Sequence, residues 1–104
     1  MTPSAISRIL NSAGHRRSKF VSGRIASTRS EGFKVEKAGL DSEGHLIVRV
    51  EYEFSTYQYR TTSEADAQKI NDKHIAEYKR TLECRGYIVR LVQGHHYNSL
   101  AAMA

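Results

Sequence analysis

The feature that most constrains the fold is an alternation of side chains over residues 45–54, HLIVRVEYEF. Apolar or aromatic residues follow one parity from Leu46 to Phe54, whereas Arg49, Glu51 and Glu53 follow the other. Successive side chains of a β-strand point to opposite faces, so the pattern predicts a strand with one buried and one solvated face. Residues 33–37 alternate in the same way and precede the turn-forming segment 39–44. The two stretches therefore predict an antiparallel hairpin.

A helical period dominates residues 63–85. Its apolar residues recur on one side, as an amphipathic helix packed on a sheet requires; they include Ala67, Ile70, Ile75, Tyr78 and Leu82. Ser63 with Asp66 resembles a capping box at the start, and Gly86 suits the end of the helix. A shorter amphipathic helix is predicted over residues 3–13, after an N-capping Thr2 and before Gly14.

The remaining segments carry weaker patterns. Residues 18–26 predict a strand that runs into a polar loop, and residues 55–60 fit either a strand extension after a bulge or an exposed loop. Residues 87–92 are apolar on both parities, which predicts a last strand that is either central in the sheet or an edge covered by a partner, and the central position is favoured. Residues 93–104 predict a flexible C-terminal tail.

Together the elements predict one α+β domain over residues 1–92, because 104 residues suit a single core. Their order is helix–strand–strand–strand–helix–strand, with an antiparallel sheet and two helices on one face. The other face stays exposed and carries Arg49, Glu51 and Glu53. A central last strand and a charged open face predict a monomer or a weak dimer.

The composition argues against disulfide-stapled, membrane-spanning and secreted proteins. A single cysteine, Cys84, excludes an internal disulfide, and no apolar run reaches the roughly 18 residues of a membrane span. The first residues lack a secretory signal pattern. A cytoplasmic protein without a membrane partner is therefore expected.

Charge is distributed unevenly along the chain. Residues 1–30 contain six basic and no acidic side chains, whereas the remainder is nearly neutral. Such a segment attracts polyanions, and arginine forks with nearby hydroxyl groups suit phosphate oxygens. A solvated face that only aids solubility is an equally simple interpretation. The candidate nucleic-acid-binding residues are Arg8, Arg16, Arg17, Lys19, Arg24 and Arg29.

No catalytic motif is present: there is no nucleophile elbow, phosphate-binding loop or dinucleotide fingerprint. We therefore predict no catalytic residues, no metal and no cofactor. Glu51 and Glu53 share a strand face, but alternating surface charge explains them more simply. A metal site would need His74, Cys84, His95 and His96, whose spacing matches no zinc pattern. Tyr52, Tyr57 and Tyr59 offer stacking surfaces for bases, although half-buried strand packing is the simpler explanation.

Two resemblances accompany these patterns. The segments Ile6-Ser7-Arg8, Ala13-Gly14, Arg17-Ser18 and 30–35, with the late run Arg85-Gly86-Tyr87-Ile88-Val89, resemble small uncharacterised proteins of actinobacteria and their phages over most of the chain. This resemblance implies an origin and no activity.

The predicted order of elements is also similar to the double-stranded-RNA-binding domain and to HicA-type messenger-RNA-cleaving toxins. The first resemblance implies phosphate-clamping lysines at the start of the second helix, where this chain has Ser63-Glu64-Ala65-Asp66. The second implies a catalytic histidine on an early strand; residues 30–35 have none, and His45 is the nearest. Shared architecture says little about function.

Three functions remain open. The first is a small basic nucleic-acid-binding protein with low sequence specificity, for which a phage is one candidate origin. The second is a module that binds an acidic host protein and modulates it. The third is a small metal-independent ribonuclease, which would leave almost no sequence motif. The balance of these patterns favours a binding role over an enzyme.

Overall fold

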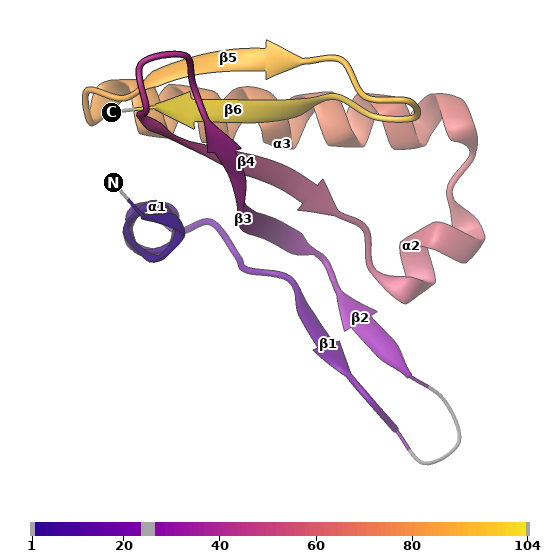
Figure 1. Cartoon of the computed structure of the whole chain (residues 1–104). Helices are drawn as coiled ribbons and strands as arrows, with labels where there is room; N and C mark the ends of the chain where they lie inside the picture. The colour runs from indigo at the N-terminus through magenta and orange to yellow at the C-terminus, as the bar shows by residue number, and fades with distance from the viewer. Residues whose placement is uncertain (1, 24–26, 104) are drawn as a thin grey trace.

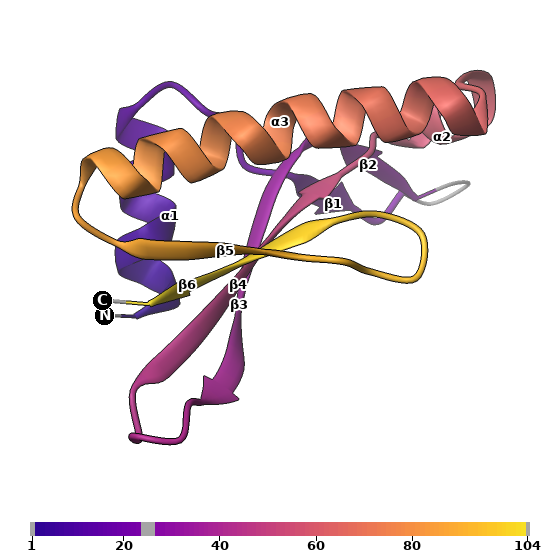
Figure 2. The ribbon, with the colours of Figure 1, turned by 90° about the horizontal axis from the view of Figure 1, so that it is seen from above.

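The structure, a computed structural model, describes residues 2–23 and 27–103. It is an α+β fold in which a four-stranded antiparallel sheet carries two helices on one face (Figures 1 and 2). The strand order is β3-β4-β6-β5, and a separate two-stranded sheet pairs β1 with β2. The predicted fold class is confirmed.

Both predicted helices are present. Helix α1 spans Pro3–Ser12, and the Thr2 side chain caps it by accepting a hydrogen bond from the Ala5 amide. Helix α3 spans Glu64–Cys84, and the Ser63 side chain accepts from the Asp66 amide at 3.2 Å. Capping side chains satisfy amide groups that have no partner within the helix.

The predicted hairpin forms from β3, Gly32–Leu40, and β4, Leu46–Glu53. Val48 and Val50 point into the core beneath the helices, whereas Arg49 lies on the open face and is exposed. The alternation in the sequence therefore reports the two faces correctly. The core is completed from several elements by the fully or nearly fully buried Ile6, Leu10, Phe33, Ile75, Tyr78, Leu82, Leu100 and Ala102.

The prediction of a flexible tail over 93–104 is wrong for residues 99–103. Strand β6, Ser99–Met103, lies between β4 and β5 and pairs with both. Leu100 and Ala102 are fully buried, and the Asn71 side chain donates a hydrogen bond to the Asn98 carbonyl at 3.0 Å. Buried apolar side chains and paired backbone groups hold the segment in the sheet.

The predicted central position of the strand at 87–92 is also wrong, because β6 takes it. Strand β5, Ile88–Val92, forms the edge of the sheet, and Ile88 and Leu91 are more than half exposed. The predicted monomer or weak dimer therefore rests only on the charged open face, because the last strand is not central. The oligomeric state stays a prediction.

Two further segments differ from expectation. Residues 55–60 were expected to be a strand extension or a loop, but Thr56–Thr61 form helix α2. A capping box between Ser55 and Gln58 starts this helix. The strand predicted over 18–26 is shorter, β1 at Lys19–Val21, and the expected polar loop contains β2 at Thr28–Ser30.

No helix in the described part of the chain has the length and apolar character that crossing a bilayer requires.

Candidate nucleic-acid interface

The structure separates the six basic candidate residues into groups. Arg8 is exposed on α1, which lies away from the β1–β2 hairpin in both views (Figures 1 and 2). Arg16 and Arg17 are exposed in the connection after α1, Lys19 begins β1, and Arg29 lies in β2. Arg24 lies outside the described residues. Four candidates, from Arg16 to Arg29, therefore belong to one region.

This region is a two-stranded ribbon that projects from the body of the molecule (Figure 1). We call residues 16–23 and 27–30 the basic arm. Lys19 pairs with Ser30, Phe20 with Arg29 and Val21 with Thr28, and all six residues are exposed. An isolated two-stranded hairpin is marginally stable in water. The arm thus adds little to the core and offers its side chains to solvent or to a partner.

The base of the arm is fixed against β3. The Ser18 amide donates to the Phe33 carbonyl at 3.0 Å, and the Phe33 amide donates to the Arg16 carbonyl at 2.8 Å. Gly32 has a φ of 151°, and a Cβ at this position would lie 2.3 Å from the Arg16 carbonyl oxygen. Only glycine allows the two backbones to approach so closely. The backbone that carries Arg16 and Arg17 is therefore held by the sheet.

Arg29 differs from the other arm cations because it is already engaged. Its guanidinium lies 3.0 Å from the Glu53 carboxylate and 5.8 Å from the centre of the Phe20 ring. Its backbone amide donates to the Thr56 hydroxyl at 2.8 Å, which fastens β2 to the start of α2. Among the described residues, Arg16, Arg17 and Lys19 form no ion pair. These three carry the uncompensated charge of the arm.

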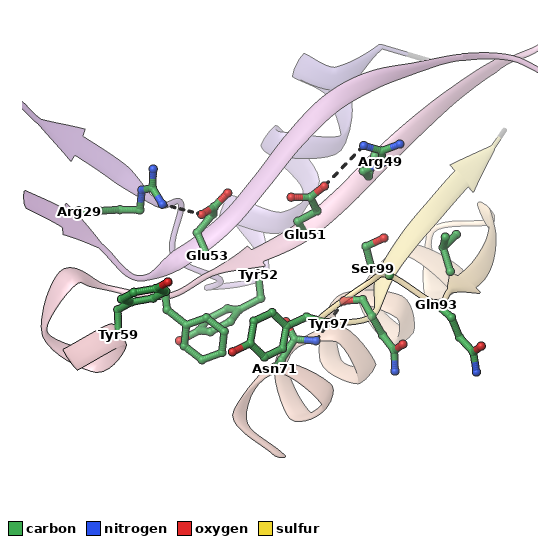
Figure 3. A pocket seen from close by; sticks show the side chains of 14 residues that line it. Arg29, Arg49, Glu51, Tyr52, Glu53, Tyr59, Asn71, Gln93, Tyr97 and Ser99 are labelled. Carbon is green, nitrogen blue, oxygen red and sulfur yellow. Dashed lines mark hydrogen bonds and ion pairs between the residues drawn. The ribbon is translucent and has the colours of Figure 1, made fainter. Parts of the chain in front are cut away.

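A hollow of about 530 Å³ opens beside the arm, where the end of β4 meets α2, α3 and the loop between β5 and β6 (Figure 3). Arg29 and Arg49 meet Glu53 and Glu51 along one wall, and Tyr59 and Tyr97 line the other. Glu53 contacts both Arg29 and Lys34, at 3.0 and 3.8 Å. Opposite charges largely neutralise each other here, so the hollow is no strong anion site.

The two glutamates of β4 have different surroundings. Burial, and secondarily the charge of Glu36, raises the pKa of Glu51 above its ordinary value. Glu53 is held between Arg29 and Lys34. The distances favour the interpretation of surface charge pairs across the sheet over an acid–base pair.

A second hollow, of about 250 Å³, lies where the arm joins the body. At its edge the Tyr52 hydroxyl donates a hydrogen bond to the Glu31 carboxylate at 2.5 Å, and the Gln58 amide donates to the same oxygen at 3.1 Å. The bond from Tyr52, opposed by some burial and helped by Gln58, lowers the pKa of Glu31. Burial raises the pKa of Tyr52, so its hydroxyl keeps its proton and stays a donor.

Two histidines line the same hollow. The His74 ring stacks on Tyr52 with 4.2 Å between ring centres, and His15 meets the edge of Tyr78 at 5.1 Å. Nε2 of His15 lies 2.8 Å from the Thr81 hydroxyl. Burial lowers the pKa of His15, and neighbouring His74 acts in the same direction against an opposing effect of Glu77. The imidazole of His15 is therefore neutral at neutral pH.

Little in the sequence indicates this cluster. His74 was expected on the buried stripe of its helix, and it does lie partly buried there. Nothing in the spacing of His15 and His74 indicates that a connection and a helix bring them together. A weak signal was the capping box Ser55–Gln58, which places Gln58 beside Glu31. Within the described residues, no group of three or more His, Cys, Asp or Glu could hold a metal ion.

Comparison with known proteins adds no relative: the chain has no significant match among protein-family models, curated proteins or solved structures.

Proposed function

We propose that this protein binds nucleic acid through its basic arm, with little preference for sequence. The observation that carries the proposal is the arm itself, a projecting ribbon whose side chains are exposed and whose base holds three cations without ion pairs among the described residues. A two-stranded ribbon fits the major groove of a DNA duplex, and cations at its base can reach the phosphates beside it.

Affinity would come mainly from phosphate contacts and the release of counterions. Arg16 and Arg17 lie on backbone that is hydrogen-bonded to β3, so they would approach a phosphate with little loss of backbone freedom. Arg29 is exposed, and an exposed ion pair is worth only about 0–1 kcal/mol, so a phosphate can compete with Glu53 for it.

Aromatic side chains next to the arm support a role in binding single strands. Tyr57 and Tyr59 lie on α2 and are 75% and 83% exposed, whereas Tyr52 is buried. The bond between Thr56 and the Arg29 backbone keeps α2 beside β2. Exposed aromatic rings near cations provide stacking surfaces for unpaired bases.

The test is binding of labelled DNA and RNA, single- and double-stranded, across a salt series from roughly 50 to 200 mM. A variant with Arg16, Arg17 and Lys19 changed to Ala should lose affinity, and its slope of log affinity against log salt should fall by up to about three. The matched control changes Lys69, Lys73 and Arg80 to Ala, which removes the same charge from exposed positions on α3. Equal losses in both variants, or no binding by the native chain at about 50 mM salt, would refute the proposal.

A protein-interaction module is a second candidate because of the β5 edge. Ile88, Leu91 and Val92 are 55%, 54% and 40% exposed there. An apolar edge strand can pair with an extended segment of another chain. Binding of this kind would depend weakly on salt and would survive the arm substitutions.

A further inference from the structure

We propose that the hollow around His15 and His74 is an acid–base site that cleaves RNA held on the basic arm, by attack of a ribose 2′-hydroxyl on the adjacent phosphate. The inference rests on the proposed nucleic-acid binding and adds to it a substrate class and a reaction.

The hydrogen bonds around His15 are compatible with a tautomer in which Nδ1 is free. The Thr81 hydroxyl lies 3.1 Å from the Glu77 carbonyl, and when it donates its proton there it acts as an acceptor towards His15. In that arrangement the bond of 2.8 Å between Thr81 and His15 uses a proton on Nε2. In a neutral imidazole this leaves a lone pair on Nδ1, for which the described residues supply no hydrogen-bond partner. In this tautomer His15 presents Nδ1 as a general base.

The same hollow contains the other groups that such a reaction needs. Tyr78 contacts both imidazoles, with ring centres 5.1 Å from His15 and 6.1 Å from His74. Stacking on Tyr52 fixes the plane of His74. Arg16 lines the hollow and continues directly into the arm, so a phosphate bound by Arg16 would lie beside both histidines. At about 250 Å³ the hollow suits a ribose and its phosphate.

The hollow holds two carboxylates, Glu31 and Glu77, and one guanidinium, Arg16, so a phosphate would bind at the side of the hollow that Arg16 lines. Glu31 accepts two hydrogen bonds on one oxygen, from Tyr52 and Gln58, which hold its carboxylate towards β4 and α2. Glu77 belongs to α3 and acts electrostatically on His15. The groups that face His15 are thus Arg16 on its own segment, Glu31 before β3, and a set on α3 comprising His74, Glu77, Tyr78 and Thr81.

The reaction balances without a co-reactant. Nδ1 of His15 takes the proton of the 2′-hydroxyl while the 2′-oxygen forms a bond to phosphorus. The bond between phosphorus and the 5′-oxygen breaks, and His74 acts as the general acid that gives a proton to that oxygen. The products are a 2′,3′-cyclic phosphate and a 5′-hydroxyl end, and the two imidazoles recover their protonation states through water.

The experiment uses the full chain with a labelled RNA, the same RNA with one 2′-deoxynucleotide, and the equivalent DNA. The native chain should cleave only RNA, leave 2′,3′-cyclic phosphate ends and spare the deoxy position. The rate should fall in the acid range, at a pH below the ordinary pKa of a histidine, because burial lowers the pKa of His15 and its protonation removes the base. A His15→Gln variant should lose at least about 100-fold in cleavage rate and keep its RNA affinity.

The matched control is His96→Gln, which changes an exposed histidine in the β5–β6 loop and should cleave like the native chain. RNA binding without cleavage, cleavage at the deoxy position, or an unchanged rate in His15→Gln would each overturn the inference and leave the binding proposal intact. Loss of RNA binding by the native chain would overturn both. The substrate comparison and the pH profile need no variant, so a folding defect in His15→Gln leaves the inference testable.

Discussion

The body of the molecule and the basic arm differ in where their side chains find partners. In the body, α1, α3 and the main sheet bury Leu10, Phe33, Tyr78 and Leu82 completely. In the arm, every residue of β1 and β2 is exposed, and the ribbon is attached through a short base along β3, one hydrogen bond to α2 and the ion pair between Arg29 and Glu53.

This difference assigns stability and recognition to separate regions. Apolar burial contributes about 25 cal/mol per Å² removed from water, and the body contains nearly all such burial among the described residues. The arm instead carries cations and an exposed Phe20. Substitutions in the body should therefore change the free energy of unfolding, and substitutions in the arm should change affinity. Each prediction below tests this separation, from the largest expected effect to the smallest.

The largest effect is expected from Leu82→Ala in α3. The side chain is fully buried in the core, so its removal should lower the free energy of unfolding by about 2–5 kcal/mol. Chemical denaturation measures this loss. At temperatures where the variant stays folded, its affinity for nucleic acid should equal that of the native chain. A loss of affinity in the folded variant would contradict the separation of the two regions.

The sequence predicts the body well where its periodicity is long. The alternation over 45–54 and the helical period over 63–85 each follow from one buried face, so β4 and α3 were predicted within about two residues. Strand β6 was missed because its inward residues, Leu100 and Ala102, are too few and too small to form a recognisable pattern. Its position between β4 and β5 depends on pairing between distant segments, which local patterns do not encode.

The candidate site was predicted in part. The excess of cations before residue 30 is visible in the sequence. The sequence does not show that Arg29 is paired while the cations at the base of the arm are not, because that difference depends on the positions of Glu53 and Phe20. Helix α2 was missed because Tyr57 and Tyr59 favour strands, while the decisive capping box involves only Ser55 and Gln58. The approach of His15 to Thr81 joins positions 66 residues apart. Only the assembled fold brings them together.

A smaller effect is expected from Gly32→Ala at the joint of the two regions. The new Cβ would lie 2.3 Å from the Arg16 carbonyl oxygen and 2.5 Å from the Ser18 nitrogen, so the arm must move away from β3. We expect a loss of about 1–3 kcal/mol in the free energy of unfolding together with weaker binding of nucleic acid.

The matched control for this change is Gly39→Ala. Gly39 also has a positive φ, of 125°, but a Cβ there would meet no atom within 4 Å, and the position lies near the far end of β3. It should lose stability through backbone strain and keep full affinity. If Gly32→Ala binds as tightly as Gly39→Ala, the fixed base of the arm is unimportant for binding.

The smallest effect is expected from Tyr52→Phe, which removes the hydrogen bond between a core strand and Glu31 at the end of the arm. That bond is the largest cause of the lowered pKa of Glu31, whose ordinary value is 4.5. A carboxyl group whose pKa is lower in the folded than in the unfolded state stabilises the fold above its unfolded pKa, and this stabilisation disappears as the pH falls through the folded pKa. The free energy of unfolding of the native chain should therefore exceed that of the variant by about 1 kcal/mol near neutral pH. The difference should shrink below the ordinary pKa of Glu31, and urea denaturation at several pH values measures it.

Because Tyr52 also stacks on His74, RNA affinity serves as the second readout. Unchanged affinity would mean that this bond serves the body alone, whereas a loss of affinity at neutral pH would show that the body and the arm are coupled through Glu31.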